Sequence, residues 1–176
     1  DAPSTATIDE PVHLTDLGNA QRVVALFGED IRYCHPWESW LVWDGQRFRP
    51  DDTSAITQLA VKTVRKMYQE AGKSTDPESR EKLAKHAIAS ESNKSVAAML
   101  SLTKSMVPIL PAELDADNWL FNHLVGTTNL RSGATSAHQR QDLITKIAPV
   151  HLDATASCPT WLTFLDRIMD GDQELI

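Results

Sequence analysis

The chain has 176 residues, of which 41% are hydrophobic and 23% charged, and its net charge is −7 at pH 7. This composition is typical of a soluble globular protein that buries one ordinary core, and it excludes a disordered chain. The acidic balance argues against a protein that coats DNA by charge alone, and no apolar run reaches the roughly 18 residues that a membrane span requires.

Residues 1–13 are polar, are interrupted by two prolines, and are expected to form a flexible arm. Thr15 is a typical N-cap, and apolar residues then recur at helical spacing until Gly28, a common residue at a helix end. These features predict a first helix over residues 16–27, with Leu17 on its buried side. The sequence does not begin like a signal peptide, and both ends of the chain look like cuts in a longer polypeptide.

The next segment, residues 31–49, is rich in aromatic and β-branched residues and contains Asp44-Gly45. This pair indicates a hairpin turn of two residues, both with positive φ. Alternation along the strand places Trp40 and Trp43 on opposite faces, each beside an aliphatic neighbour. Because neither face is polar, the hairpin is expected to be covered on both sides or to expose an aromatic surface. Core packing is the more common use of tryptophan.

The middle part of the chain, residues 53–107, is predicted to be helical. A helix near residues 54–71 has an apolar stripe at helical spacing, and its basic side chains lie mostly on the outer face. Asp76 followed by proline predicts the start of a third helix, on whose inner face Ile88 is expected. A fourth helix is predicted near residues 93–105.

The last third of the chain is predicted to contain short strands and one helix. Strands with tight turns are expected near residues 119–135, followed by a strand or extended segment over 142–150. The predicted architecture is therefore α+β: mainly helical, with two short β-hairpins near residues 31–49 and 119–135 and a closing C-terminal helix. The side chains expected to be buried in that helix are Trp161, Leu162, Leu165, Ile168 and Met169.

Candidate chemical motifs are incomplete. Gly72-Lys73-Ser74 ends like a phosphate-binding loop, but the required glycine is missing at position 67 and a helix precedes it. Asp115 and Asp117 have the spacing of a metal-binding carboxylate pair, although a polar turn is the more common use of such residues. The two cysteines are far apart, which fits a reducing compartment. No zinc template fits the spacing of Cys34, His35, His151 and Cys158.

The outer face of the helix near residues 54–71 is the best candidate for binding an anionic partner. Residues 51–107 carry nine basic and seven acidic side chains, whereas the parts before and after them are acidic. A solvated helix face is the more common explanation of such a pattern. Phosphate contact is a more plausible role than base readout, because the sequence has no recognition-helix motif.

The order of several segments resembles one known family. The chain resembles the amino-terminal accessory domain that precedes the superfamily 3 helicase domain in phage and plasmid primase–helicases of the poxvirus type, over about residues 14–176. The segments are LTDLGNAQRVVALFGEDIRY, WLVWDGQRF, DNWLFN, NLRSG, DLITKIAPV and CPTWLTFLDRIM. The family pattern is matched at Leu17, Gly18, Asn19, Ala20, Arg22, Trp40, Trp43, Asp44, Gly45, Asn122, Gly126, Leu130, Arg131, Gly133, His138, Ile144, Thr145 and Lys146. It is not matched at Val125, Asn129 and Ser132, where the family usually has Asn, Asp and Thr.

The resemblance implies that residues 14–176 form a single linker domain without a catalytic centre. Such a domain connects primase and helicase modules, supports ring assembly and contacts DNA in replication. Its implied partners are single-stranded or forked DNA and the neighbouring domains, in a ring-shaped homo-oligomer in the cytoplasm of a bacterial host. ATP and magnesium would bind to domains outside this chain, and no cofactor or metal is expected within it. The expected phosphate contacts are Arg47, Arg49, Lys62, Arg65, Lys66, Lys104 and Arg131.

Two alternatives stay open at this point. The first is a protein-interaction or oligomerisation module with no DNA contact, which the net charge of −7 favours. The second is a metal-dependent nucleotidyl-transfer domain that uses Asp115 and Asp117.

Overall fold

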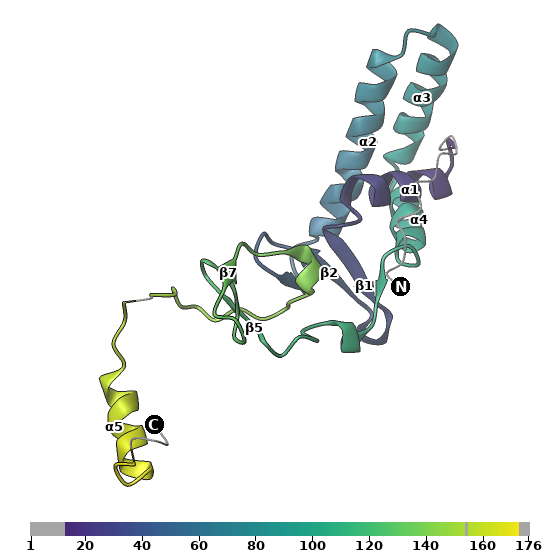
Figure 1. Ribbon diagram of the computed structural model, residues 1–176. Helices are drawn as coiled ribbons and strands as arrows, with labels where there is room; N and C mark the ends of the chain where they lie inside the picture. Colours follow the sequence, from purple (N-terminus) through teal and green to yellow (C-terminus); the bar gives the residue numbers. More distant parts are fainter. Residues whose placement is uncertain (1–12, 154, 173–176) are drawn as a thin grey trace.

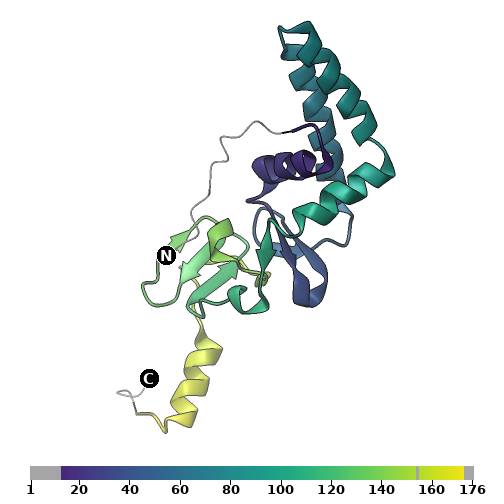
Figure 2. The same cartoon turned by 90° about the vertical axis from the view of Figure 1, so that its right-hand side faces the viewer.

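The computed structural model describes residues 13–153 and 155–172. This part of the chain forms five α-helices and two small sheets, so the fold is α+β, as predicted. Figures 1 and 2 show a helical part resting on the first sheet, a second sheet beyond it, and a C-terminal helix that stands apart. The expected flexible arm, residues 1–13, lies outside the described residues except for His13.

The helical part consists of α1 to α4, and in each of these helices a side-chain oxygen accepts an N–H of the first turn. The hydroxyl of Thr15 and the carboxylate of Asp76 each accept a first-turn N–H, at 3.1 and 2.8 Å, as their N-cap patterns predict. α2 differs, because Ser54 has a positive φ and its side chain makes no cap. The carboxylate of Asp51 instead accepts two N–H groups of the first turn, at 2.7 and 3.0 Å. The helices are α1 Asp16–Phe27, α2 Ala55–Lys73, α3 Pro77–Ser90 and α4 Asn93–Thr103.

The first hydrophobic core lies where α1 to α4 meet one face of the first sheet. The apolar stripe of α2 is buried there, as its helical spacing predicts. Two other predictions are wrong: Leu17 and Ile88 are exposed, because α1 and α3 pack through other sides that bury Asn19 and Ser90. The buried residues of this core are Val23, Ile31, Tyr33, Ile56, Ala60, Val64, Met67, Ala87, Met99 and Val107.

The first sheet has four strands in the order β3-β2-β1-β4. β1 and β2 are antiparallel, with Tyr33 opposite Trp40, and a short 3-10 turn joins them. β4 follows the helices and lies parallel to β1, so the chain returns to the same sheet after α4. The strands are β1 Ile31–Cys34, β2 Ser39–Trp43, β3 Phe48–Pro50 and β4 Pro108–Ile109.

The two tryptophans of β2 pack on opposite faces of the first sheet. The ring centroid of Trp40 lies 5.0 Å from that of Tyr33, in the core under the helices. Trp43 packs against a second core on the other face, where its ring lies 5.4 Å from that of Phe48. The sheet is therefore covered on both sides, and these two rings serve the fold rather than the stacking of bases.

The Asp44-Gly45 turn is wider than predicted. Trp43 pairs with Phe48, so four residues connect the strands, and among them Gly45 alone has a positive φ, of 101°. The carboxylate of Asp44 accepts two N–H groups within the loop, both at 2.9 Å. These hydrogen bonds stabilise the four-residue loop in place of the two-residue turn.

The second sheet is the predicted second hairpin, extended by one short strand in the order β5-β6-β7. Its inner face is held by Asn122, whose amide donates to the carbonyl oxygens of Gln46 (3.1 Å) and Lys146 (2.9 Å). Asn122 therefore joins the second sheet to the loop of the first sheet and to the segment that follows residue 142. The strands are β5 Leu120–His123, β6 Gly126–Asn129 and β7 Thr135–Ser136.

The C-terminal helix α5, Pro159–Ile168, is present as predicted, but none of its residues is buried. Trp161 and Ile168 are 56% and 53% exposed, and Figure 1 shows α5 separated from both sheets. The prediction that its apolar side chains are buried is therefore wrong, because an amphipathic pattern shows which side needs cover but not whether cover is present. Among the described helices, none is both long and apolar enough to cross a membrane.

Candidate nucleic-acid interface

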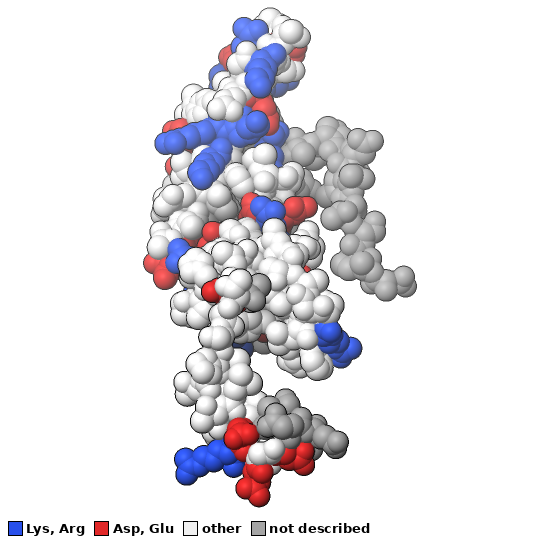
Figure 3. All heavy atoms as spheres, turned by 60° about the vertical axis from the view of Figure 1, so that its left-hand side comes forward, with Lys and Arg blue, Asp and Glu red and all other residues white. Residues whose placement is uncertain are grey.

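Basic side chains follow one exposed face of α2. Lys62, Arg65, Lys66 and Lys73 recur at spacings that place them on the same side of a helix, opposite the buried stripe. We call these four residues the α2 basic stripe. Figure 3 shows basic side chains gathered over this helical end of the molecule. At 1.5 Å per residue, the stripe extends over roughly 16 Å.

The members of the α2 basic stripe form no ion pairs with the described acids, although Glu91 and Glu70 line the same hollows as Arg65 and Lys66. Glu70 is the one acidic residue of α2, and its carboxylate is bound by Arg22 of α1 at 2.7 Å. None of the ion pairs between described residues includes a member of the stripe. Exposed lysine and arginine side chains without a carboxylate partner are the usual contacts to phosphate oxygens. The face is therefore chemically suited to an anionic polymer.

Two shallow hollows flank the α2 basic stripe. One, of about 240 Å³, lies between α2 and the start of α4, with Arg65 and Glu91 among its lining residues. The other, of about 150 Å³, lies between α1 and α2 and is lined in part by Arg22 and Lys66. Both are smaller than the roughly 300–1,000 Å³ of a typical ligand pocket. The surface therefore suits a chain lying across it better than an enclosed small molecule.

The two predicted contacts of the first hairpin are engaged in the fold. The guanidinium of Arg47 donates to the carbonyl oxygen of Thr145 (3.0 Å) and lies 3.9 Å from the carboxylate of Asp44. Arg49 lies 3.8 Å from the carboxylate of Asp52. Both charges are thus partly balanced by acids of the same hairpin region, which weakens their attraction for phosphate.

The remaining predicted contacts lie on aromatic rings in other parts of the fold. The ammonium of Lys104, at the end of α4, is 4.6 Å from the ring centroid of Tyr33, and the guanidinium of Arg131 is 4.4 Å from that of Trp119. The seven predicted residues therefore do not form one surface. The three on α2 adjoin one another, two lie on the first hairpin, and Lys104 and Arg131 lie on two further parts of the fold.

The carboxylates of Asp115 and Asp117 serve different local contacts. Asp115 has a φ of 51° and accepts the N–H (2.8 Å) and the hydroxyl (2.5 Å) of Thr145. Asp117 accepts the N–H of Trp119 at 2.9 Å. Burial and, secondly, the charge of Asp117 raise the pKa of Asp142. Hydrogen bonds within the fold thus occupy both carboxylates of the candidate metal pair.

The candidate zinc ligands are not brought together. Cys34 is buried in the second core, whereas Cys158 is exposed at the start of α5. Within residues 13–153 and 155–172, no group of three His, Cys, Asp or Glu side chains is placed to hold a metal ion.

Sequence reasoning missed a buried polar cluster that joins α1 to α3. Asn19 is fully buried, its amide donates to the hydroxyl of Ser90 (2.9 Å), and its carbonyl oxygen accepts the Nε2–H of His86 (2.8 Å). Burial, and then the charge of Arg22, lower the pKa of His86, so the ring is neutral at pH 7. The available signal was a polar residue within the apolar stripe of α1, together with a histidine and serine four residues apart on α3.

The match to a known protein family covers most of this architecture. A family model described as "D5 N terminal like" matches residues 20–170, from within α1 to just beyond α5. Both sheets and the α2 basic stripe lie inside the matched range. Among curated proteins, none matches the chain. The chain therefore belongs to the D5 N-terminal-like family, the amino-terminal domains of D5-like primase–helicases.

Proposed function

We propose that this chain is a non-catalytic linker domain of a replicative primase–helicase and that its α2 basic stripe contacts the backbone of DNA. The observation that carries the proposal is an exposed row of four cations on one helix of an otherwise acidic chain. The family match supports the replication context. The uncovered apolar side of α5 supports a role beside other domains, because such a side is stabilised when a neighbour covers it.

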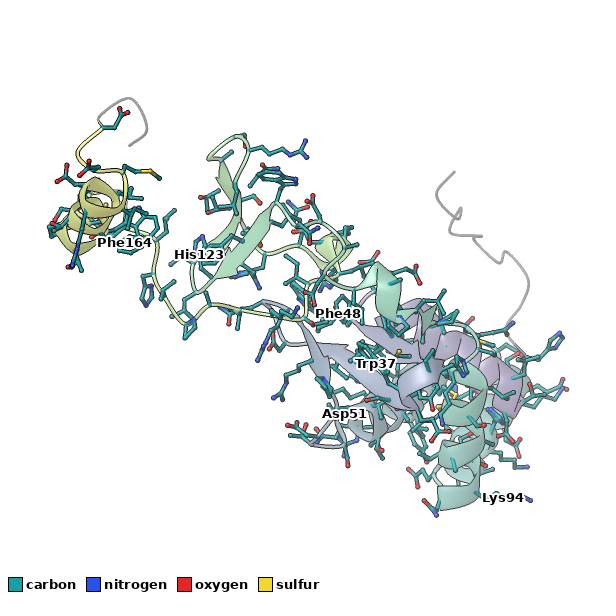
Figure 4. All side chains as sticks on the ribbon, turned by 90° about the horizontal axis from the view of Figure 1, so that it is seen from below. Trp37, Phe48, Asp51, Lys94, His123 and Phe164 are labelled. Carbon is teal, nitrogen blue, oxygen red and sulfur yellow. The ribbon has the colours of Figure 1, made fainter. Side chains whose placement is uncertain are left out.

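The proposed mechanism is positional. The cations attract phosphates and release counterions, and they read no sequence, because phosphate contacts carry none. A stripe of roughly 16 Å matches about five nucleotides of one strand at about 3.4 Å each. Figure 1 shows α2 and α5 at opposite ends of the molecule, and in Figure 4 α5, marked by Phe164, lies apart from the helical part. The domain can thus contact DNA through its helical end while α5 contacts a neighbouring module.

The rest of the proposal concerns the parent protein. We place this domain between the primase and the superfamily 3 helicase of a ring-forming, poxvirus-type enzyme of a phage or plasmid. ATP and magnesium would bind to the helicase and primase domains and not to this one. Replication of phage or plasmid DNA would place the enzyme in the cytoplasm of a bacterial host.

The test is a salt series of fluorescence-anisotropy titrations with single-stranded and forked DNA. The triple variant Lys62→Gln, Arg65→Gln, Lys66→Gln removes three cations of the stripe. Lys82→Gln, Lys85→Gln, Lys94→Gln is a matched control, because it removes the same charge from exposed positions on α3 and α4. Three lost phosphate contacts lower the slope of log affinity against log salt by about 2 for a single strand.

The control separates a local contact from the effect of net charge. We expect the control variant to keep most of its affinity and its salt slope, whereas the stripe variant loses both. Equal losses in the two variants would show that overall charge, and not the stripe, determines binding. Unchanged binding in the stripe variant would refute the proposed contact.

A second candidate function is a protein-interaction module without DNA contact, and α5 is the observation that favours it. Trp161, Leu162, Phe164 and Ile168 are all exposed on this one helix. Sedimentation over a range of concentrations tests the idea, with Leu162→Asp as the variant that disrupts an apolar contact. Self-association that the variant abolishes, together with an absence of DNA binding at low salt, would favour this second function.

A further inference from the structure

The second sheet has an inner and an outer face of different character. Phe121 lies between Leu120 and Asn122 on β5, so it points to the side opposite to Asn122. Trp119 directly precedes β5, and its carbonyl oxygen accepts the N–H of Leu130 (2.8 Å), so the pairing continues through Trp119 and places it on the side of Phe121. The side of Asn122 is turned toward the first sheet, because its amide bonds to the loop of that sheet. The aromatic pair therefore lies on the outer face, where Trp119 is 45% and Phe121 41% exposed.

The outer face is ordered by hydrogen bonds of its own, because His123 and Thr128 lie on the same face as Phe121, and the ring centroid of His123 is 6.0 Å from that of Phe121. The ring of His123 is fully buried, and its Nε2 lies 2.9 Å from the hydroxyl of Thr128. That hydroxyl lies 2.8 Å from the hydroxyl of Thr135 on β7, so one chain of hydrogen bonds crosses all three strands. His138 bonds to the carbonyl oxygen of His123 at 2.9 Å. The exposed rings thus lie beside an ordered, buried part of the same face, which reduces the entropy lost when they bind a partner.

The charge around these rings is unusual for an acidic protein. Residues 118–141 contain no Asp or Glu, and they include two arginines, of which Arg140 is paired with Asp30 of the first part of the chain. The other, Arg131, lies with its guanidinium 4.4 Å from the ring centroid of Trp119. Asp117, whose carboxylate accepts the N–H of Trp119, marks one edge of the face. A polyanion would therefore be attracted by Arg131 and repelled near Asp117.

We infer that the outer face of the second sheet binds unpaired bases of single-stranded DNA, by stacking on Trp119 and Phe121 while Arg131 contacts a phosphate. The inference rests on the proposed function for the choice of DNA as ligand, and it adds a second surface of different chemistry. Exposed aromatic rings beside a cation are the usual platform for unpaired bases, because every base has a π-face. Paired bases in a duplex cannot reach such rings.

The spacing of the rings suits separate bases. Residues two apart on a strand are about 7 Å apart, which is twice the roughly 3.4 Å rise of stacked bases. Each ring can therefore take one base of an extended strand. The stacking contact differs from the α2 basic stripe in one measurable respect: it requires bases and depends little on salt, whereas the stripe requires only phosphates.

The experiment compares two oligonucleotides of equal length and charge, one of deoxythymidine and one of abasic sites, by fluorescence anisotropy at moderate salt. We expect the wild-type chain to bind the oligonucleotide with bases at least about fivefold more tightly. The double variant Trp119→Leu, Phe121→Leu is expected to bind both equally. Trp37→Leu is the matched control, because Trp37 is also exposed, at 52%, but lies beside the first sheet. It is expected to keep the wild-type preference.

Equal binding of the two oligonucleotides by the wild-type chain would overturn the inference. The proposed function would survive that result if the stripe variant still lost its salt-dependent binding, so the two failures are distinguishable. No binding of either oligonucleotide at low salt would overturn both. If the double variant does not fold, cross-linking of the wild-type protein to DNA that contains 5-iodouracil tests the same contact. Adducts on Trp119 or Phe121 support the inference, and adducts confined to other residues overturn it.

Discussion

Replacing Asn19 with alanine tests whether the buried polar cluster joins α1 to α3. The change removes two buried hydrogen bonds, to Ser90 (2.9 Å) and from His86 (2.8 Å). Each contributes about 1 kcal/mol, and the Nε2–H of His86, left with the hydroxyl of Ser90 at 3.4 Å, costs about 1 kcal/mol more. Ser90 loses less, because its hydroxyl still donates to the carbonyl oxygen of His86 (2.8 Å). We expect the free energy of unfolding to fall by about 3 kcal/mol.

Urea unfolding followed by far-UV circular dichroism measures this loss, and thermal unfolding gives a second value. A loss of about 3 kcal/mol corresponds to a decrease in Tm of roughly 6–12 °C for a chain of this size. Gln21→Ala is a suitable control, since Gln21 lies on α1 two residues from Asn19 but is partly exposed. A stability of Asn19→Ala within about 0.5 kcal/mol of wild type would refute the reasoning, because surface positions typically show changes of that size.

Three further predictions concern single positions. Gly126→Ala should lower the free energy of unfolding by about 2 kcal/mol or more, because the new Cβ would lie 2.3 Å from a backbone oxygen of β7. Gly72→Ala has free space for its Cβ and should raise the free energy of unfolding slightly. Equal effects of the two variants in urea unfolding would contradict this prediction. The pKa of His86 is lower in the folded chain than its ordinary value of 6.5, so the unfolded chain binds more protons. The stability that the neutral ring contributes is therefore present above about pH 6.5 and is lost as the pH falls. His86→Gln should remove this part of the pH dependence. If the free energy of unfolding of His86→Gln changed from pH 7 to 5 as it does in the wild type, the prediction would be contradicted. Trp40→Leu should lower the free energy of unfolding by about 2 kcal/mol, because Trp40 packs against the first core. Trp37→Leu should lower it by less than about 0.5 kcal/mol, because Trp37 is exposed. A Tm that falls no further in Trp40→Leu than in Trp37→Leu would contradict this prediction.

Features that depend on a few neighbouring residues were predicted well. Thr15 and Asp76 mark the beginnings of α1 and α3, because an N-cap requires only a side-chain oxygen and an N–H three residues later. Features that depend on a covering surface were predicted poorly. Ile88 of α3 and the apolar residues of α5 recur at helical spacing, yet their side chains are exposed. Helical spacing does not show whether another element covers that side of the helix.

The candidate site shows the same division. The α2 basic stripe was predictable because helical spacing alone places its members side by side. The placement of Arg47 was not, because its partner Thr145 lies 98 residues further along the chain. Arg131 was predicted as a phosphate contact, but the sequence alone did not show that its guanidinium lies on the ring of Trp119. Such arrangements require the strand pairing of the second sheet.

Several positions that resemble the family join elements of the fold, and they lie apart from the α2 basic stripe that is proposed to contact DNA. Asn19 and Arg22 join α1 to α3 and α2, and Asn122 joins the two sheets, so these residues hold the elements together. Exposed cations such as Lys62 contribute little to stability. A variant at a junction should therefore lose stability first, and DNA affinity only as a consequence, whereas a variant in the α2 basic stripe should lose affinity at unchanged stability. Measuring unfolding and DNA binding on the same variants thus separates a residue that positions the domain from one that contacts its ligand.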